Sequence, residues 1–346
     1  MSKKVKIGSL YIGGGEKIAV QSMTNVKTEN VDKVVEQINA LEKNGCDIVR
    51  VAVKDQSDAN AIKLIKQKTS VPLVADVHFD YRLAVASIEN GVDKVRINPG
   101  NIGSECNIKY VADCLKNYDI PVRVGSNTGS IEKEFLQKYG KNEISLVESA
   151  LKNVYALEKY GVENIVISTK ASNVPLTVKA YRYLKSKTDY PLHIGVTEAG
   201  VYESGIIKSS IGIGSLLLDG IGDTVRVSLT ADPINEPIVA RKILRFSGIE
   251  KDFAEVISCP TCGRTEYNSI ALAERIEKLV ANYNKPLKIA VMGCVVNGPG
   301  EAMDCDLGIA GSKDFCVIFK KGKVIKKVPF DACEEEFIKE LEKIDE

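Results

Sequence analysis

Residues 1–246 repeat one pattern eight times: a short run rich in β-branched residues, a polar end, and then an amphipathic stretch of helical period. Each unit takes roughly 25 to 35 residues, as expected for alternating strands and helices around a parallel sheet. Eight such units predict a (β/α)8 TIM barrel, whereas a doubly wound sheet would need a break that the pattern lacks. The predicted strands are Ala19–Ser22, Asp47–Val53, Pro72–His78, Lys94–Asn98, Pro121–Ser126, Asn164–Ser168, Pro191–Thr197 and Asp223–Leu229.

A glycine-rich segment precedes the first of these strands. Tyr11–Ile18 predicts a hairpin at the bottom of the barrel. It is not a phosphate-binding loop, because no helix follows it.

Four of the predicted strands carry an arginine between two β-branched residues. These arginines are Arg50, Arg96, Arg123 and Arg226. Because side chains alternate along a strand, each arginine points into the barrel if its neighbours face the outer helices. Four buried, unpaired guanidinium groups would be too costly. Internal carboxylates such as Asp76 and Glu198 offer one solution. A bound polyanionic small molecule is the favoured one, because guanidinium groups match phosphate geometry.

Polar residues stand at the ends of the same strands, where barrel enzymes place their sites. They are His78, Asn98, Asn127, Ser168, Lys170, Thr197, Glu198 and Ser228. Together with the arginines they predict a pocket for a diphosphate. Glu198 is the candidate proton donor, with the positioning of an arginine as its alternative role. His193 is interpreted as an ordinary strand residue.

The boundary between two predicted domains falls at residues 247 and 248. Residues 1–247 form the barrel, and residues 248–346 form a small α/β module that contains six of the nine cysteines. In this module the strands Ala254–Ser258 and Leu287–Met292 each lead into a cysteine, with a helix at Ser269–Tyr283 between them. Strands at Phe315–Phe319 and Lys323–Val328 form a hairpin.

Three of these cysteines have the spacing of metal or cluster ligands: Cys259 and Cys262 in a Cys-x-x-Cys pair, and Cys294 further on. A structural zinc ribbon would need a second such pair or two histidines. Three thiolates and one weaker ligand suit a [4Fe–4S] cluster with one exchangeable position. Ligand softness favours Cys305 as the fourth ligand. Alternatively, a tight turn at 297–300 brings Glu301 back toward the cysteines.

Composition limits the classes of function. The net charge of +1 argues against a general nucleic-acid binder. No apolar run reaches the length of a membrane span, and the N-terminus lacks the apolar core of a signal peptide, so we expect a cytoplasmic protein. The lysines of the C-terminal hairpin predict a solvated edge, with the docking of an acidic electron carrier as the alternative.

Several motifs resemble the 4-hydroxy-3-methylbut-2-enyl diphosphate synthase family, over essentially the whole chain. They are Ile257-Ser-Cys-Pro-Thr-Cys-Gly-Arg264, Gly293-Cys-Val-Val-Asn-Gly-Pro-Gly-Glu-Ala302, Gly220-Ile-Gly-Asp-Thr-Val-Arg-Val-Ser-Leu229 and Asn98-Pro-Gly-Asn101. The resemblance implies the compact two-domain bacterial form. It also implies the two-electron reductive ring opening of 2-C-methyl-D-erythritol 2,4-cyclodiphosphate with loss of water, in the non-mevalonate isoprenoid pathway.

The resemblance further implies the ligands and contacts of the site. Cys259, Cys262 and Cys294 would hold a [4Fe–4S] cluster with Glu301 as fourth ligand, which overrules Cys305. Glu198 would supply a proton. The implied substrate contacts are Arg50, His78, Arg96, Arg123, Asn127, Lys170, Thr197, Arg226, Ser228 and Asn297.

The family also implies partners: ferredoxin or flavodoxin as electron donor, and a homodimer in which the cluster domain of one subunit closes over the barrel of the other. The short linker Ser247–Lys251 favours closure in trans over closure within one subunit. Two rival functions stay open: a barrel transferase of the pterin-binding type with a structural zinc module, and a protein that stores or senses an anionic metabolite.

Overall fold

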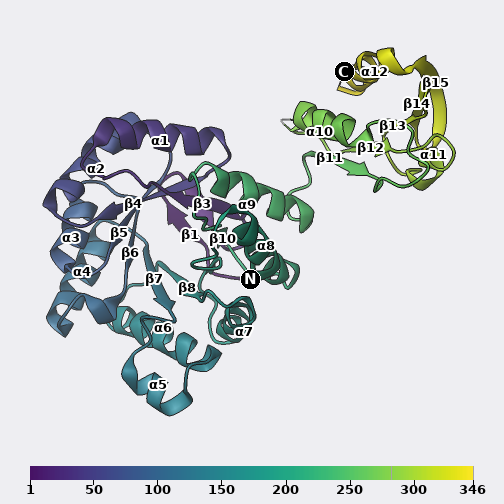
Figure 1. Ribbon diagram of the computed structural model, residues 1–346. Coiled ribbons are helices and arrows are strands. Elements are labelled where there is room, and N and C mark those ends of the chain that lie inside the picture. Colours follow the sequence, from purple (N-terminus) through teal and green to yellow (C-terminus); the bar gives the residue numbers. More distant parts are fainter. Residues whose placement is uncertain (282, 346) are drawn as a thin grey trace. The chain divides into compact units, whose positions relative to one another are not determined.

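The computed structural model describes residues 1–281 and 283–345. The chain divides into two compact units, Met1–Ile249 and Glu250–Glu346 (Figure 1). Each unit has its own sheet and its own buried core, and they are described separately.

The first unit is built on an eight-stranded parallel sheet in the order β8-β7-β6-β5-β4-β3-β10-β9. A bridge between Ile167 of β8 and Leu192, just before β9, joins the two edges and closes the barrel. Every predicted barrel strand is present, so the (β/α)8 prediction is confirmed. The strands are β3 (Ala19–Met23), β4 (Ile48–Val53), β5 (Leu73–Val77), β6 (Lys94–Ile97), β7 (Val122–Asn127), β8 (Ile165–Lys170), β9 (His193–Ile194) and β10 (Thr224–Val225).

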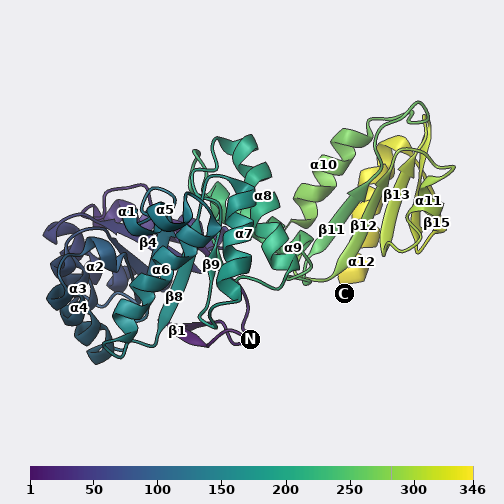
Figure 2. The same cartoon turned by 90° about the horizontal axis from the view of Figure 1, so that it is seen from below.

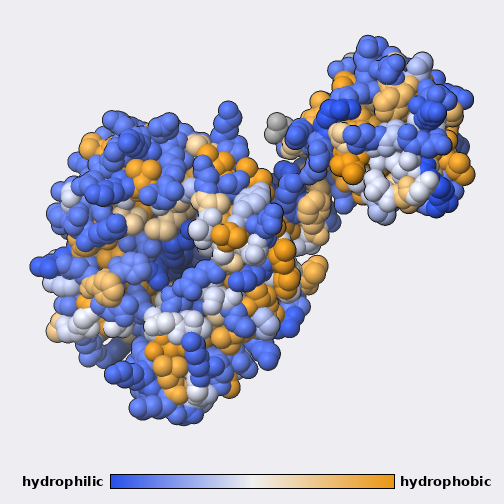
Figure 3. Space-filling model, viewed as in Figure 1, coloured by the Kyte–Doolittle hydropathy of each residue, from blue (hydrophilic) through white to orange (hydrophobic). Residues whose placement is uncertain are grey.

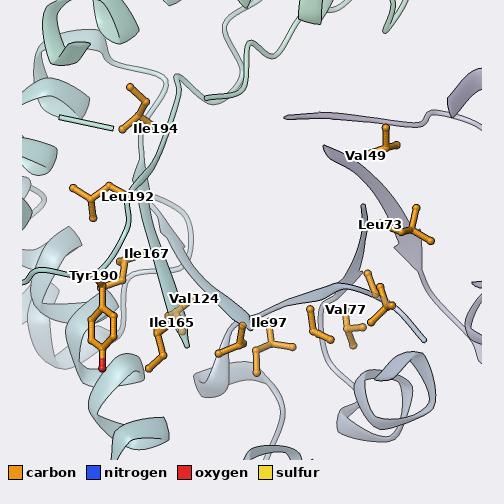
Figure 4. Close-up of a cluster of buried hydrophobic side chains, with 14 of the residues drawn as sticks. Val49, Leu73, Val77, Ile97, Val124, Ile165, Ile167, Tyr190, Leu192 and Ile194 are labelled. Carbon is orange, nitrogen blue, oxygen red and sulfur yellow. The ribbon is translucent and has the colours of Figure 1, made fainter. Parts of the chain in front are cut away.

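Helices cover the outside of this sheet, and the main core lies between the two layers. In Figure 4, Val49, Ile97 and Val124 each point outward from their own strand. Because side chains alternate along a strand, the residues next to them in sequence point inward. The helices are α1 (Val31–Lys43), α2 (Gln56–Lys68), α3 (Tyr81–Glu89), α4 (Glu105–Asn117), α5 (Lys133–Tyr139), α6 (Glu143–Glu158), α7 (Val174–Lys185), α8 (Tyr202–Leu218) and α9 (Asn235–Phe246), with a 3-10 turn η1 at Pro99–Asn101.

A hairpin closes the bottom of the barrel, but its position differs from the prediction. It consists of β1 (Val5–Ile7) and β2 (Leu10–Ile12), earlier than the expected Tyr11–Ile18. The turn uses Gly8 at φ +57°, whereas the three glycines that follow β2 form a loop with positive φ. Buried apolar residues of the hairpin pack against strand residues such as Ile48 and Val166.

The second unit is a five-stranded mixed sheet in the order β11-β12-β13-β14-β15 (Figure 2). The first three strands are parallel, and β14 and β15 run antiparallel. The strands are β11 (Ala254–Ser258), β12 (Leu287–Met292), β13 (Leu307–Gly311), β14 (Phe315–Lys320) and β15 (Lys323–Pro329). The helices are α10 (Ser269–Val280), α11 (Gly298–Glu301) and α12 (Cys333–Asp345), with a 3-10 turn η2 at Phe330–Ala332.

The two faces of this sheet are covered differently. On one face, α10 and α12 pack over a core that includes Leu272 and Phe337. On the other face, the segment 293–306 packs through Ala302 and Cys305 against Phe319. In place of the turn predicted at 297–300, the structure has the start of the short helix α11. Pro299 stands in the first turn of this helix, where proline is favoured because its missing amide is not needed. Among the described residues, no helix is long and apolar enough to cross a membrane.

Candidate active site

The carboxyl ends of the barrel strands carry a cluster of cationic side chains organised around Asp76 of β5. Asp76 Oδ2 lies 3.5 Å from Arg50 Nε of β4, and Asp76 Oδ1 accepts a hydrogen bond from Arg96 Nη1 of β6 at 3.0 Å. Burial alone would raise the pKa of Asp76, but Arg50, His78 and Arg96 hold it well below its ordinary range. Asp76 is therefore an ionised carboxylate that holds two of the four predicted arginines.

Arg123 of β7 has no such partner. Its side chain is buried, with the residue 3% exposed, and neither Nε nor Nη1 has a hydrogen-bond partner among the described residues. Burial lowers the pKa of Arg123 well below its ordinary value, and the nearby Arg50 and Arg96 lower it further. An unsatisfied guanidinium in a buried site is costly, and an anionic ligand would satisfy it.

The fourth arginine is held by a residue that the sequence analysis did not single out. Arg226 Nε donates to Glu236 Oε2 at 3.2 Å, and Glu236 also accepts from Ser22 Oγ. Glu236 is buried in the first turn of α9. Glu236 follows Arg226 by ten residues, which is the spacing expected between a barrel strand and the start of the next helix. This spacing could have identified Glu236 from the sequence.

Lys170 adds another cation at the end of β8. Burial holds its pKa well below its ordinary value, and Arg123 and Arg226 lower it further. A Cβ on Gly195 would lie 2.8 Å from Lys170 Nζ, so the glycine leaves room for the ammonium group. Together with the four arginines, Lys170 gives five cationic side chains against two carboxylates in this region. Figure 3 shows a hollow lined by hydrophilic residues at the centre of the barrel.

The remaining predicted residues lie around this cationic cluster at the strand ends. Asn127 and Lys170 are register partners on β7 and β8. His78 is exposed, and its Nε2 lies 3.2 Å from Arg96 Nη1. Thr197 and Ser228, each three residues beyond a strand, are half-buried.

Glu198 is exposed at the end of β9 and adopts φ +52°, a conformation that non-glycine residues rarely use. No ion pair holds its carboxylate within the part of the chain that the structure describes. Strained backbone of this kind is concentrated at functional sites.

A second polar layer lies inside the barrel and was missed in the sequence. Lys94 and His193 are both fully buried, and burial holds the pKa of each well below its ordinary value. His193 Nδ1 lies 2.7 Å from Thr224 Oγ1. His193 is a residue of β9, as the interpretation of an ordinary strand residue expects. Alternation could have revealed Lys94, because it stands two residues before Arg96 on the same strand.

In the second unit the cysteines follow neighbouring parallel strands. Cys259 comes directly after β11 and Cys294 two residues after β12, and Ser258 pairs with Val291 in register. The amide of Gly293 donates to Cys259 Sγ at 2.9 Å. Parallel strands that end side by side therefore bring the two cysteine loops together.

The other two predicted ligands are linked to this region through Arg264. Hydrogen bonds from the Arg264 backbone and side chain lower the pKa of the exposed Cys262. Cys262, Cys294 and Glu301 in turn raise the pKa of Arg264. Asn297 is half-buried at the start of α11, and its carbonyl accepts from the Glu301 amide.

The remaining cysteines of this unit are core residues. Cys305 is fully buried beside Ala302 and Phe319, and burial raises its pKa to about 11. Cys316 and Cys333 are also buried. Ligand softness favoured Cys305 as the fourth cluster ligand, but its burial in an apolar core does not support that role.

The predicted ligands of the second unit are three thiols and one carboxylate. Within residues 1–281 and 283–345, no three histidine, cysteine or acidic side chains lie close enough together to hold one metal ion. Cys259 and Cys262 follow β11, and Cys294 and Glu301 follow β12; thiolates are the usual ligands of iron–sulfur clusters, so these residue types fit such a cluster.

Comparison with known families settles the relationship. The model described as "GcpE TIM-barrel domain" matches residues 2–241, and that of the "GcpE protein C-terminal domain" matches residues 255–343. The chain belongs to the GcpE family. The resemblance seen in its motifs is thereby confirmed, as is the fold of a TIM barrel followed by a smaller domain.

Curated relatives carry one name, 4-hydroxy-3-methylbut-2-en-1-yl diphosphate synthase (flavodoxin). The relative from Caldanaerobacter subterraneus subsp. tengcongensis is 59% identical over 345 residues, covering 99% of this chain and 97% of the relative. The relative from Clostridium perfringens is 53% identical over 344 residues and 99% of both chains.

Solved structures with a similar barrel include dihydropteroate synthases. That of Yersinia pestis has a TM-score of 0.53 at 10% identity, covering 72% of this chain and 98% of that one. That of Vibrio fischeri ES114 has a TM-score of 0.53 at 13% identity, covering 71% and 97%. Identity this low shows a shared fold alone, so the pterin-type transferase is not favoured.

Proposed function

We propose that this protein catalyses the reductive ring opening of 2-C-methyl-D-erythritol 2,4-cyclodiphosphate to 4-hydroxy-3-methylbut-2-enyl diphosphate. Two electrons and two protons enter, one carbon–oxygen bond to the diphosphate breaks, and a hydroxyl oxygen leaves as water. The observation that carries the proposal is the buried guanidinium of Arg123 in a cationic barrel mouth, whose Nε and Nη1 have no hydrogen-bond partner among the described residues. The name shared by the relatives supports the same reaction and its place in isoprenoid biosynthesis.

The barrel, residues 1–247, is the proposed substrate domain. Its cationic side chains bind the diphosphate and stabilise the oxygen that is released as the ring opens. Arg123 binds a phosphate oxygen directly, whereas Asp76 positions Arg50 and Arg96. The proposed contacts are Arg50, His78, Arg96, Arg123, Asn127, Lys170, Thr197, Arg226 and Ser228.

Residues 248–346 form the proposed cluster domain. Cys259, Cys262 and Cys294 would hold a [4Fe–4S] cluster, with Glu301 as a fourth ligand that substrate can replace. When bound, the cluster supplies the electrons, which no side chain of the chain can provide. Asn297 contacts the substrate from the cluster loop.

Glu198 is the proposed proton donor. It is exposed at the strand end, and no ion pair among the described residues holds its carboxylate, so a proton can reach it from solvent.

The proposed partners are an electron donor and a second copy of the chain. Flavodoxin is the donor named for the relatives, and ferredoxin is the alternative. A groove of about 700 Å³ between α8 and α9 is lined by apolar residues, including the exposed Ile211, Leu218 and Phe246. Figure 3 shows apolar side chains over these helices. We assign this face to a homodimer in the cytoplasm, with the cluster domain of one subunit over the barrel of the other.

Anaerobic purification followed by iron, sulfide and zinc analysis tests this function. About four irons per chain, together with turnover of the cyclic diphosphate by a chemical reductant, are expected. One zinc and no turnover would favour the transferase, and tight binding of the substrate without turnover would favour a storage protein.

Two substitutions test the choice of fourth ligand. Glu301→Ala should leave the iron content intact and lower turnover at least 100-fold, because an exchangeable ligand at the reacting iron is lost. Cys305→Ser should retain iron and most activity but lower the free energy of unfolding by about 1–3 kcal/mol, because a hydroxyl would be buried in the core. Loss of iron from Cys305→Ser with full activity in Glu301→Ala would show that Cys305 is the ligand.

A further inference from the structure

A turn in the second unit packs against the segment that follows Glu301. The turn joins β14 to β15, and Lys321 donates its amide to the Cys305 carbonyl at 3.0 Å. A Cβ on Gly322 would lie 3.1 Å from Met303 Cγ and 3.3 Å from the Pro299 carbonyl oxygen. The turn is therefore fixed on α11 and the residues after it.

The turn presents positive charge that the fold does not neutralise. Lys321 and Lys323 are exposed, and neither forms an ion pair within the described part of the chain. Lys320 differs, because its ammonium lies 3.4 Å from Glu340 of α12 on the other face of the sheet. Lys321 and Lys323 are therefore free to contact an anionic partner.

Exposed apolar side chains adjoin these lysines. Met303 is 66% exposed and lies against Gly322. Val324 is 54% exposed, and it pairs across the strands with Phe319, on the same sheet face as Cys305. Apolar groups beside unpaired charges are typical of protein-binding surfaces. We call Lys321, Lys323, Met303 and Val324 the basic turn surface.

The topology separates this surface from the side where substrate must approach. Cys259 and Cys294 lie at the carboxyl ends of β11 and β12, so a cluster held by them would lie at that end of the sheet. Because β14 runs antiparallel to β13, the β14–β15 turn lies at the opposite end of the sheet. A protein bound at the turn would leave the open side to the substrate.

The flank of the cysteine loops that faces α10 carries negative charge, in contrast to the basic turn surface. A groove of about 380 Å³ beside Cys259 is lined by the carboxylate of Glu274 of α10. An acidic protein would be repelled there and attracted to the basic turn surface. The charge distribution therefore selects one flank for such a partner.

We propose that the basic turn surface docks an acidic electron-transfer protein that reduces the cluster; this inference rests on the proposed function. In each encounter the docked donor would lose one electron to a cluster held by the cysteine loops, so two encounters would supply one turnover. The contact is expected to be small and transient, as redox encounters are. Long-range attraction to Lys321 and Lys323 would speed association.

The test is the double charge reversal Lys321→Glu/Lys323→Glu in the iron-loaded protein, with an acidic flavodoxin as the probe. At ~50 mM salt, we expect the Kd for flavodoxin, measured by calorimetry, to rise at least about tenfold. The rate of cluster reduction by flavodoxin should fall by a similar factor. Turnover with reduced methyl viologen, which needs no docking surface, should stay within about twofold.

Lys278→Glu is the matched control. Lys278 is exposed on α10, over the other face of the sheet, and forms no ion pair among the described residues. It reverses one charge where the double variant reverses two, and it should leave the Kd within about twofold. The milder Lys321→Gln/Lys323→Gln should weaken flavodoxin binding in the same direction but less.

Three results would overturn the docking proposal: an unchanged Kd in the double variant, an equal loss with Lys278→Glu, or a parallel loss of viologen-driven turnover. The last would mean that the turn serves substrate turnover or folding. Failure of the wild-type protein to turn over the cyclic diphosphate with viologen would instead contradict the proposed function, while the calorimetric Kd would still report on docking.

Discussion

At the scale of single residues, Arg123 combines a positively charged side chain with a buried position. Its guanidinium is buried, and Nε and Nη1 have no hydrogen-bond partner among the described residues. Such a group destabilises the free protein and becomes satisfied when an anion binds. The buried guanidinium of Arg123 therefore lowers the stability of the free protein but is already in position to bind a phosphate.

Arg123→Met should therefore separate binding from stability. We expect substrate affinity to fall by about 30-fold or more, since losing one partner of a buried charged pair costs roughly 2–5 kcal/mol. The free energy of unfolding should stay the same or increase, because a methionine fills the space without a charge. Substrate titration and urea denaturation measure the two effects, and a large loss of stability with unchanged affinity would give Arg123 a purely structural role.

Asp76 gives the opposite case, a buried carboxylate whose partners are present. Its folded pKa is depressed below the unfolded value of about 3.9, so its contribution to stability is complete above that pH and is lost as the pH falls. Asp76→Asn should lower the free energy of unfolding by about 3–5 kcal/mol at neutral pH, because a buried pair is broken. In urea denaturation, the difference from wild type should be constant from pH 7 to 5 and shrink in more acidic solution. A difference that persists unchanged in acid would mean that Asp76 does not hold the arginines as an ionised group.

At the scale of elements, the two ends of the barrel have different tasks. The β1–β2 hairpin seals the amino-terminal ends of the strands, and the cationic site occupies the carboxyl ends. Stability and function therefore depend on different loops.

Ile7→Ala tests this separation. Ile7 is fully buried in the hairpin, so the substitution should lower the free energy of unfolding by about 2–5 kcal/mol while the KM for substrate stays unchanged. Tyr11 on the same hairpin is 47% exposed, and Tyr11→Ala should cost less than about 1 kcal/mol. Thermal melting and steady-state kinetics give both quantities. A raised KM in Ile7→Ala, at a temperature where the variant is folded, would show that the hairpin also shapes the site.

At the scale of the whole molecule, the open question is which subunits combine to form one active site. If the cluster domain acts on the barrel of the partner, two inactive variants should complement each other. At a substrate concentration well below the Kd of Arg123→Met for substrate, this variant and Cys294→Ser are each expected to show little activity alone. After unfolding, mixing and refolding with iron, half of the random dimers would be mixed, and each would contain one intact site and one doubly defective site. We expect about a quarter of wild-type activity, measured after sedimentation has confirmed dimers. No recovery in proven mixed dimers would place the whole site within one subunit.

The sequence by itself determined the periodic features. Alternation along the strands predicted both the eight-stranded barrel and the inward arginines, because period 2 fixes which side chains share a face. The cysteine spacing and motifs pointed to the cluster loops and to the family. These are local properties of the chain.

Only the tertiary structure decided which groups meet across elements. Asp76 holds two arginines and Glu236 holds a third, whereas Nε and Nη1 of Arg123 have no hydrogen-bond partner among the described residues. These pairings depend on strand register and on the packing of α9. The burial of Cys305, which ligand softness had favoured, likewise depends on how residues 293–306 fold over the sheet. A sequence gives the side chains and their order. Which of them form ion pairs and which are removed from water depends on distances that are set only when the chain folds.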